Sequence, residues 1–69
     1  MFEMKIENQM NIADRTLLSG VPKYDSIPEK VSVDGKDFKV IGTSYGVPFP
    51  FMSIEIEKTS ANLIGKTIK

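Results

Sequence analysis

The stretch EKVSVDGKDFKVI, residues 29–41, contains two alternating apolar rows on either side of Asp34-Gly35. Successive side chains of a β-strand point to opposite faces, so the apolar members of each row share one face. These members are Val31, Val33, Phe38 and Val40. Asp-Gly between two such rows is a strong turn signal. The stretch therefore predicts an antiparallel β-hairpin whose apolar face must be covered by the rest of the chain.

Two registers are compatible with this hairpin. A two-residue loop, Asp34-Gly35, places Val33 opposite Lys36, and Asp-Gly favours this loop. A four-residue loop, Asp34–Asp37, places Val33 opposite Phe38 and leaves no charge opposite an apolar residue. Cross-strand apolar pairs contribute about 0.2–1 kcal/mol each, so the pairing favours the four-residue loop. In both registers the apolar side chains share a face.

Length and composition limit what the chain can do. Its 69 residues are expected to form a single β-barrel domain, 1–69, and chains of this size bury only about 60% of the surface that their unfolded form exposes. The chain has no cysteine and no histidine, so thiolate chemistry, the commonest metal ligand and the commonest general base are all missing. We therefore expect no catalytic residues, no metal site, no cofactor and no enzymatic activity.

Nine basic and nine acidic residues balance to a net charge of zero. The chain thus lacks the basic excess of an electrostatically driven nucleic-acid binder, although a local basic patch is still open. No apolar run approaches the length of a bilayer span, and the start, MFEMKIE, alternates charge with hydrophobe, unlike a signal peptide. The expected location is the cytoplasm, with no membrane partner.

The first half of the chain shows further alternation. Apolar residues occupy even positions, namely Phe2, Met4, Ile6, Met10 and Ile12. This period favours one half-exposed strand, or two strands broken near Asn8, over a competing helical stripe with no N-cap. Residues Thr16–Val21 predict a strand with a bulge or bend at Gly20. Residues Lys23–Pro28 predict a loop.

The second half begins with a segment rich in glycine, proline and aromatic residues, Gly42–Met52, which predicts an edge or connecting segment. Residues Ser53–Glu57, SIEIE, predict a strand with its isoleucines inward, and Leu63–Ile68 a last short strand with a bulge at Gly65. About six short strands without a convincing helix favour a small all-β fold, a closed or partly open antiparallel β-barrel.

The order of these landmarks resembles the second, β-barrel domain of the translational GTPases, such as elongation factor Tu. The resemblance rests on FEMKIENQMNIADRTLLSGV, IPEKVSV, DFKVIG, MSIEIEK and ANLIG. Two positions depart from the family pattern, where Pro28-Glu29 and Asn62-Leu63 replace Gly-Asp. The resemblance implies a fold. It brings no hydrolytic activity, because the nucleotide-binding domain is absent and the family has no catalytic residue in this barrel, so no nucleotide is expected.

The aromatic segment is the leading candidate site. Its candidate binding residues are Tyr45, Val47, Phe49 and Phe51. Pro48 and Pro50 hold this segment extended, and aromatic side chains on such a segment offer large contact area with few rotatable bonds. The alternative is that these rings close one end of the barrel as part of the core.

Three other patterns favour structural interpretations. Gly65-Lys66-Thr67 lacks the upstream glycine and downstream helix of a phosphate-binding loop. Glu55 and Glu57 alternate as on a solvated strand face, and the lysines near the C-terminus are typical of a soluble surface. We therefore expect any partner surface to include Tyr45–Met52 and not the Gly-Lys-Thr segment.

Two functions fit these observations. The first is a stand-alone small binding module that docks to a protein or RNA partner. The second is an accessory structural domain that forms oligomers through its aromatic segment. Light scattering separates the two, because a stable dimer favours the second and a monomer the first.

Overall fold

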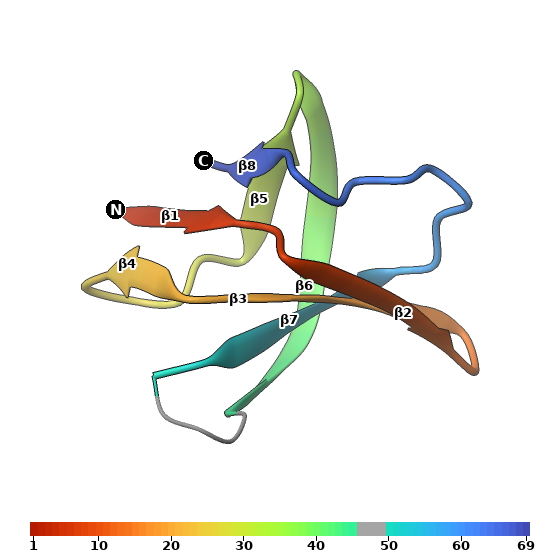
Figure 1. Ribbon diagram of the computed structural model, residues 1–69, viewed down its shortest axis with the longest axis horizontal. Helices are drawn as coiled ribbons and strands as arrows, with labels where there is room; N and C mark the ends of the chain where they lie inside the picture. Colours follow the sequence, from red (N-terminus) through yellow and green to blue (C-terminus); the bar gives the residue numbers. More distant parts are fainter. Residues whose placement is uncertain (46–49) are drawn as a thin grey trace.

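A computed structural model describes residues 1–45 and 50–69, which form eight strands and no helix (Figure 1). The strands are β1 (Phe2–Lys5), β2 (Asn8–Ile12), β3 (Arg15–Gly20), β4 (Pro22–Tyr24), β5 (Lys30–Val33), β6 (Lys36–Tyr45), β7 (Met52–Glu57) and β8 (Thr67–Ile68). They make one antiparallel sheet in the order β2-β3-β7-β6-β5-β8-β1-β4. The all-β class is confirmed. Within the described residues, hydrogen bonds do not close this sheet into a barrel.

The central hairpin is confirmed, but its predicted register is wrong. Val31 pairs with Phe38 and Val33 pairs with Lys36, so the loop is the two-residue Asp34-Gly35. Both loop residues have positive φ, 56° and 84°, as the type I′ turn requires. The turn geometry therefore outweighs the apolar pairing that favoured the longer loop. Lys36 accommodates this register by placing its ammonium 5.4 Å from the centre of the Phe38 ring.

One face of the sheet forms the core. Its buried hydrophobic residues are Phe2, Met4, Ile6, Leu18, Val31, Val33, Phe38, Met52, Ile54, Ile56, Leu63 and Ile68. Flat, an eight-stranded sheet would be about 34 Å wide, with seven spacings of about 4.8 Å, whereas the molecule measures only 27 × 24 × 21 Å. The sheet is therefore curled around its own apolar face, as Figure 1 shows.

The chain itself links the two ends of the strand order. Strand β1 continues through residues 6 and 7 into β2, and β3 continues through residue 21 into β4. Met4 lies opposite Pro22, and Asn8 lies opposite Ser19. The segment from Met4 to Asn8 is therefore one residue longer than the segment from Ser19 to Pro22 that it faces. The amide of Glu7 donates to the carbonyl of Ser19 at 2.8 Å, which places a β-bulge at Glu7-Asn8.

This bulge reverses which side chains face inward. Before it, the even residues Phe2, Met4 and Ile6 are buried, as the alternation predicts. After it, Met10 and Ile12 are exposed on the outer face, so the prediction that they share the core is wrong. The break near Asn8 is confirmed. An extra residue in one strand shifts the inward–outward alternation by one position, so the even-numbered side chains face inward before the bulge and outward after it.

Gly20 marks the bend between β3 and β4. A Cβ atom at this position would lie 2.2 Å from the carbonyl oxygen of Lys5, so only glycine lets the two bent strands approach this closely. The bend predicted at Gly20 is confirmed, and β3 begins and ends one residue before the predicted strand.

Three other strand predictions are corrected by the structure. Lys23 and Tyr24, which lie in the predicted loop Lys23–Pro28, belong instead to β4. This strand pairs with β1 and needs no amide from Pro22 because it lies at the sheet edge. Residues Gly42–Tyr45 extend β6 past a bulge at Ile41 and pair with β7. The last strand is only Thr67–Ile68, because Gly65 adopts a φ of 88° in a turn.

In the part of the chain that the structure describes, no helix has the length and apolarity needed to cross a membrane.

Candidate functional site

Two exposed tyrosines meet at one end of the curled sheet. Tyr24 ends β4 and Tyr45 ends β6, and their hydroxyl oxygens lie 3.5 Å apart. Tyr45 is 63% exposed and Tyr24 is 40% exposed. These strands are not neighbours in the sheet, so it is the curl that brings the two side chains together. The arrangement presents two polar-tipped aromatic surfaces to the solvent.

The buried ring of Phe2 packs against Tyr24. The Phe2 and Tyr24 rings lie opposite each other across β1 and β4, with centroids 5.7 Å apart and planes tilted by 44°. Tilted aromatic contacts of this kind contribute about 0.5–1.5 kcal/mol beyond the burial of area. The Tyr24 ring therefore rests on the core, while its hydroxyl lies at the surface.

The contact between the tyrosines changes the acidity of one of them. The hydrogen bond to Tyr45, with smaller contributions from desolvation and charge, raises the pKa of Tyr24 above its usual value. The neutral phenol is thus the favoured form, and both hydroxyls are available to donate or accept hydrogen bonds.

Phe51 lies one residue before the strand that pairs with the end of β6. It is half-buried and directly precedes Met52, which pairs with Tyr45. We call Tyr24 and Tyr45 the tyrosine end. The other two predicted binding residues, Val47 and Phe49, lie outside the described residues. Of the predicted set, the structure places Tyr45 beside Tyr24, which sequence reasoning had placed in a loop, and Phe51 directly before β7.

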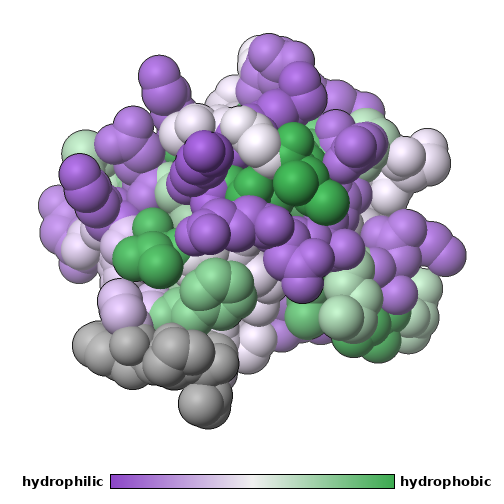
Figure 2. Space-filling view, in the orientation of Figure 1, coloured by the Kyte–Doolittle hydropathy of each residue, from purple (hydrophilic) through white to green (hydrophobic). Residues whose placement is uncertain are grey.

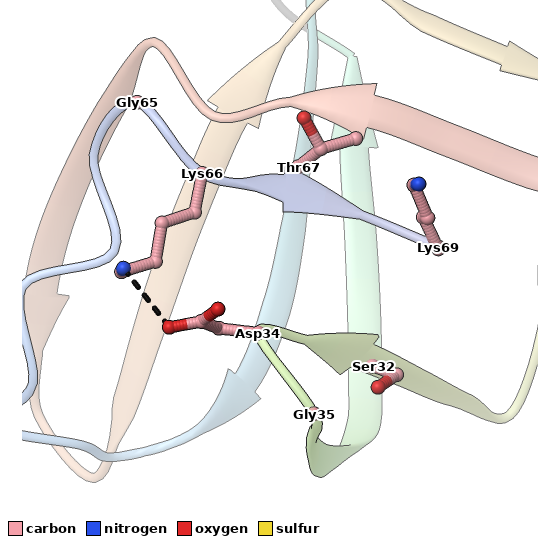
Figure 3. Close-up of a pocket in the computed structure, with 7 residues that line it drawn as sticks. All are labelled: Ser32, Asp34, Gly35, Gly65, Lys66, Thr67 and Lys69. Atoms are coloured by element: carbon pink, nitrogen blue, oxygen red, sulfur yellow. Dashed lines mark hydrogen bonds and ion pairs between the residues drawn. The ribbon is translucent and has the colours of Figure 1, made fainter.

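Gly65-Lys66-Thr67 lies beside the Asp34-Gly35 turn (Figure 3). The ammonium of Lys66 is 3.1 Å from a carboxylate oxygen of Asp34, and Thr67 begins a strand and not a helix. Thr67 and Lys69 point to one side of β8, whereas Lys66 points away toward Asp34. The rejection of a nucleotide-type phosphate loop at these residues is thus consistent with the geometry.

Glu55 does not form a site with Glu57. Its carboxylate is 2.6 Å from the guanidinium of Arg15, which also contacts Asp14 at 3.4 Å. The hydrogen bond to Glu55, followed by that to Asp14, raises the pKa of Arg15. Among the residues that the structure describes, no group of three or more acidic side chains is placed to hold a metal ion.

Gln9 has a structural role that the sequence alternation concealed. Its side-chain amide donates to the carbonyl of Ala61 at 2.8 Å, and its side-chain oxygen accepts from the amide of Leu63 at 2.7 Å. The bulge turns Gln9 to the inner face, where it fastens the segment that leads to β8. Thr16, fully buried, likewise accepts from the amide of Thr59 at 3.0 Å.

Comparison of the chain with family models, with curated proteins and with solved structures found no match. The site is therefore interpreted from its own geometry.

Proposed function

We propose that the chain is a small binding module that docks a protein partner at the tyrosine end. The exposure of Tyr45 beside Tyr24 is the observation that carries this proposal. Tyrosines are enriched at interface hot spots, because they bury large area with few rotatable bonds and retain a hydroxyl for hydrogen bonding. In this proposal the surface extends into Val47 and Phe49, as the sequence predicts.

We also propose that the fold is a partly open β-barrel. A curled antiparallel sheet whose end strands are linked by the chain is compatible with a partly open β-barrel of the translation-factor second-domain type. Non-catalytic docking in the cytoplasm is the role that this resemblance and the residue inventory support. RNA as the docked partner and self-association through the aromatic segment are the alternatives that the experiment separates.

The test uses the immobilised protein in an extract of the source cell, with captured protein and RNA both analysed. Tyr45→Ser should lose the captured protein, because the most exposed ring of the tyrosine end is removed. Ile64→Ser is the matched control, since Ile64 is 51% exposed and belongs to a different surface. Lys66→Ala should also keep the partner.

Several outcomes would contradict the proposal. Retention of every captured protein by Tyr45→Ser, together with their loss in Lys66→Ala, would move the surface to the Gly-Lys-Thr segment. Capture of RNA alone would replace the protein partner with RNA. A stable dimer in light scattering, abolished by Tyr45→Ser, would make the tyrosine end a subunit interface.

A further inference from the structure

The neutral net charge of the chain is unevenly distributed over its surface. Register places the buried residues of β1, β5, β6 and β8 inward, so the residues between them face outward. Five lysines face outward, namely Lys23 on β4, Lys5 on β1, Lys30 on β5, Lys39 on β6 and Lys69 directly after β8. We call this the basic face.

Few acidic groups oppose these lysines. Glu3 pairs across the sheet with Lys23, and the carboxylate of Asp37 lies 3.5 Å from the ammonium of Lys30. Glu57 also faces outward beside Lys39, because Val40 pairs with Ile56. Five lysines against these three carboxylates leave about two unbalanced positive side-chain charges. Nearby, Asp25 is paired with the Met1 ammonium, which lowers the pKa of Asp25, and Asp34 is paired with Lys66.

Two shallow hollows lie side by side on this face and share Thr67. One is lined by Lys5, Lys23 and Glu3, the other by Lys69, Ser32 and the Lys66–Asp34 ion pair at its edge. Figure 3 shows the Thr67 hydroxyl and the Lys69 ammonium on the same side of β8. Hydroxyl donors thus lie between the ammonium groups, which suits anionic oxygens.

We propose that the basic face binds the phosphate backbone of a single-stranded nucleic acid. Its lysines step from strand to strand across the sheet, and each step from Lys30 to Lys69, Lys5 and Lys23 also moves two residues along the strands. Successive lysines therefore lie about 8 Å apart and can meet roughly every second phosphate of a strand. A linear polyanion can meet several of these lysines at once, whereas a small anion meets one or two. Among the residues that the structure describes, no aromatic ring lies between these lysines, so we expect binding that is independent of sequence and sensitive to salt.

This proposal is independent of the tyrosine end. Lys23 and Tyr24 are neighbours on β4, but they point to opposite faces of the sheet. Tyr45→Ser should therefore retain nucleic-acid binding while losing the protein partner, so either proposal can fail without the other.

The experiment measures fluorescence anisotropy of a labelled oligouridine as a function of salt concentration. Each phosphate contact contributes about 0.7 to the slope of log K against log salt, so the double variant Lys5→Gln/Lys69→Gln should lower the slope by about 1.4. The matched control, Lys36→Gln/Lys58→Gln, removes the same charge from other surfaces and should leave the slope unchanged. Should the first double variant unfold, each single variant is expected to lower the slope by about 0.7.

Four results would overturn the proposal. They are no binding by the wild-type protein at low salt, equal weakening in both double variants, equal competition by polyglutamate, and equal competition by inorganic phosphate at the same phosphate concentration. The third would assign the face to an acidic protein and the fourth to a small anion. Amide shifts of the wild-type protein on addition of oligouridine should centre on Lys5, Thr67 and Lys69.

Discussion

At the scale of single residues, Gly20 controls how the two bent strands meet. Any side chain there would meet the Lys5 carbonyl, which belongs to the backbone and cannot move without opening β1 from β3 and β4. Gly42 is different, since its nearest neighbour is the Glu55 carboxylate at 3.3 Å, the end of a flexible side chain.

Gly20→Ala should therefore lower the free energy of unfolding by about 1–3 kcal/mol or more, as overpacking does. Gly42→Ala, the matched control, should cost less, because the Glu55 side chain can shift. Urea denaturation of the two variants makes the comparison. An unmoved midpoint for Gly20→Ala would mean that the strands do not approach each other at this point.

The tyrosine pair makes a second prediction at this scale. Tyr45→Phe removes the hydrogen bond that raises the pKa of Tyr24, so the pKa of Tyr24 should fall towards its ordinary value. The chain has only two tyrosines, so ultraviolet absorbance of the variant against pH follows Tyr24 alone. A pKa of Tyr24 that stays equally high in Tyr45→Phe would show that the two hydroxyls do not interact.

At the scale of elements, the turn decides the register of the central hairpin. Asp34 and Gly35 both adopt positive φ, and a left-handed conformation costs about 1–2 kcal/mol for a residue with a Cβ. Gly35→Ala should lower the free energy of unfolding by about this amount. Asp34→Asn should be nearly neutral, because asparagine suits the same turn. Equal stability of Gly35→Ala and the wild-type protein in thermal unfolding would argue against this turn.

Local sequence patterns predicted most of the strands, but they did not predict for every strand which side chains are buried. Alternation correctly placed Met52–Glu57 and the hairpin rows, since those segments contain no bulge between their inward residues. It failed at Met10 and Ile12, because the bulge at Glu7-Asn8 depends on a partner strand that the local pattern does not reveal. It also missed Tyr24, which only the curl of the sheet brings to Tyr45.

At the scale of the whole molecule, one sheet supplies its own core and leaves chemically different outer surfaces. Figure 2 shows hydrophobic residues in small separate groups among hydrophilic ones, one group lying over the end of β2. The exposed side chains of Met10 and Ile12 belong to this strand. The side-chain oxygen of Asn8 accepts from the amide of Gln9 at 3.0 Å, which occupies one backbone donor of this edge strand.

The bulge at Glu7-Asn8 reverses the inward face between β1 and β2, and the four methionines test this reversal directly. Met1 and Met10 are 73% and 51% exposed, whereas Met4 and Met52 are 1% and 0% exposed. Oxidation by hydrogen peroxide follows exposure, and peptide mass spectrometry resolves each methionine. We predict rapid oxidation of Met1 and Met10 and protection of Met4 and Met52, with all four reacting alike in denaturant. Protection of Met10 to the level of Met4 in the folded protein would contradict this account.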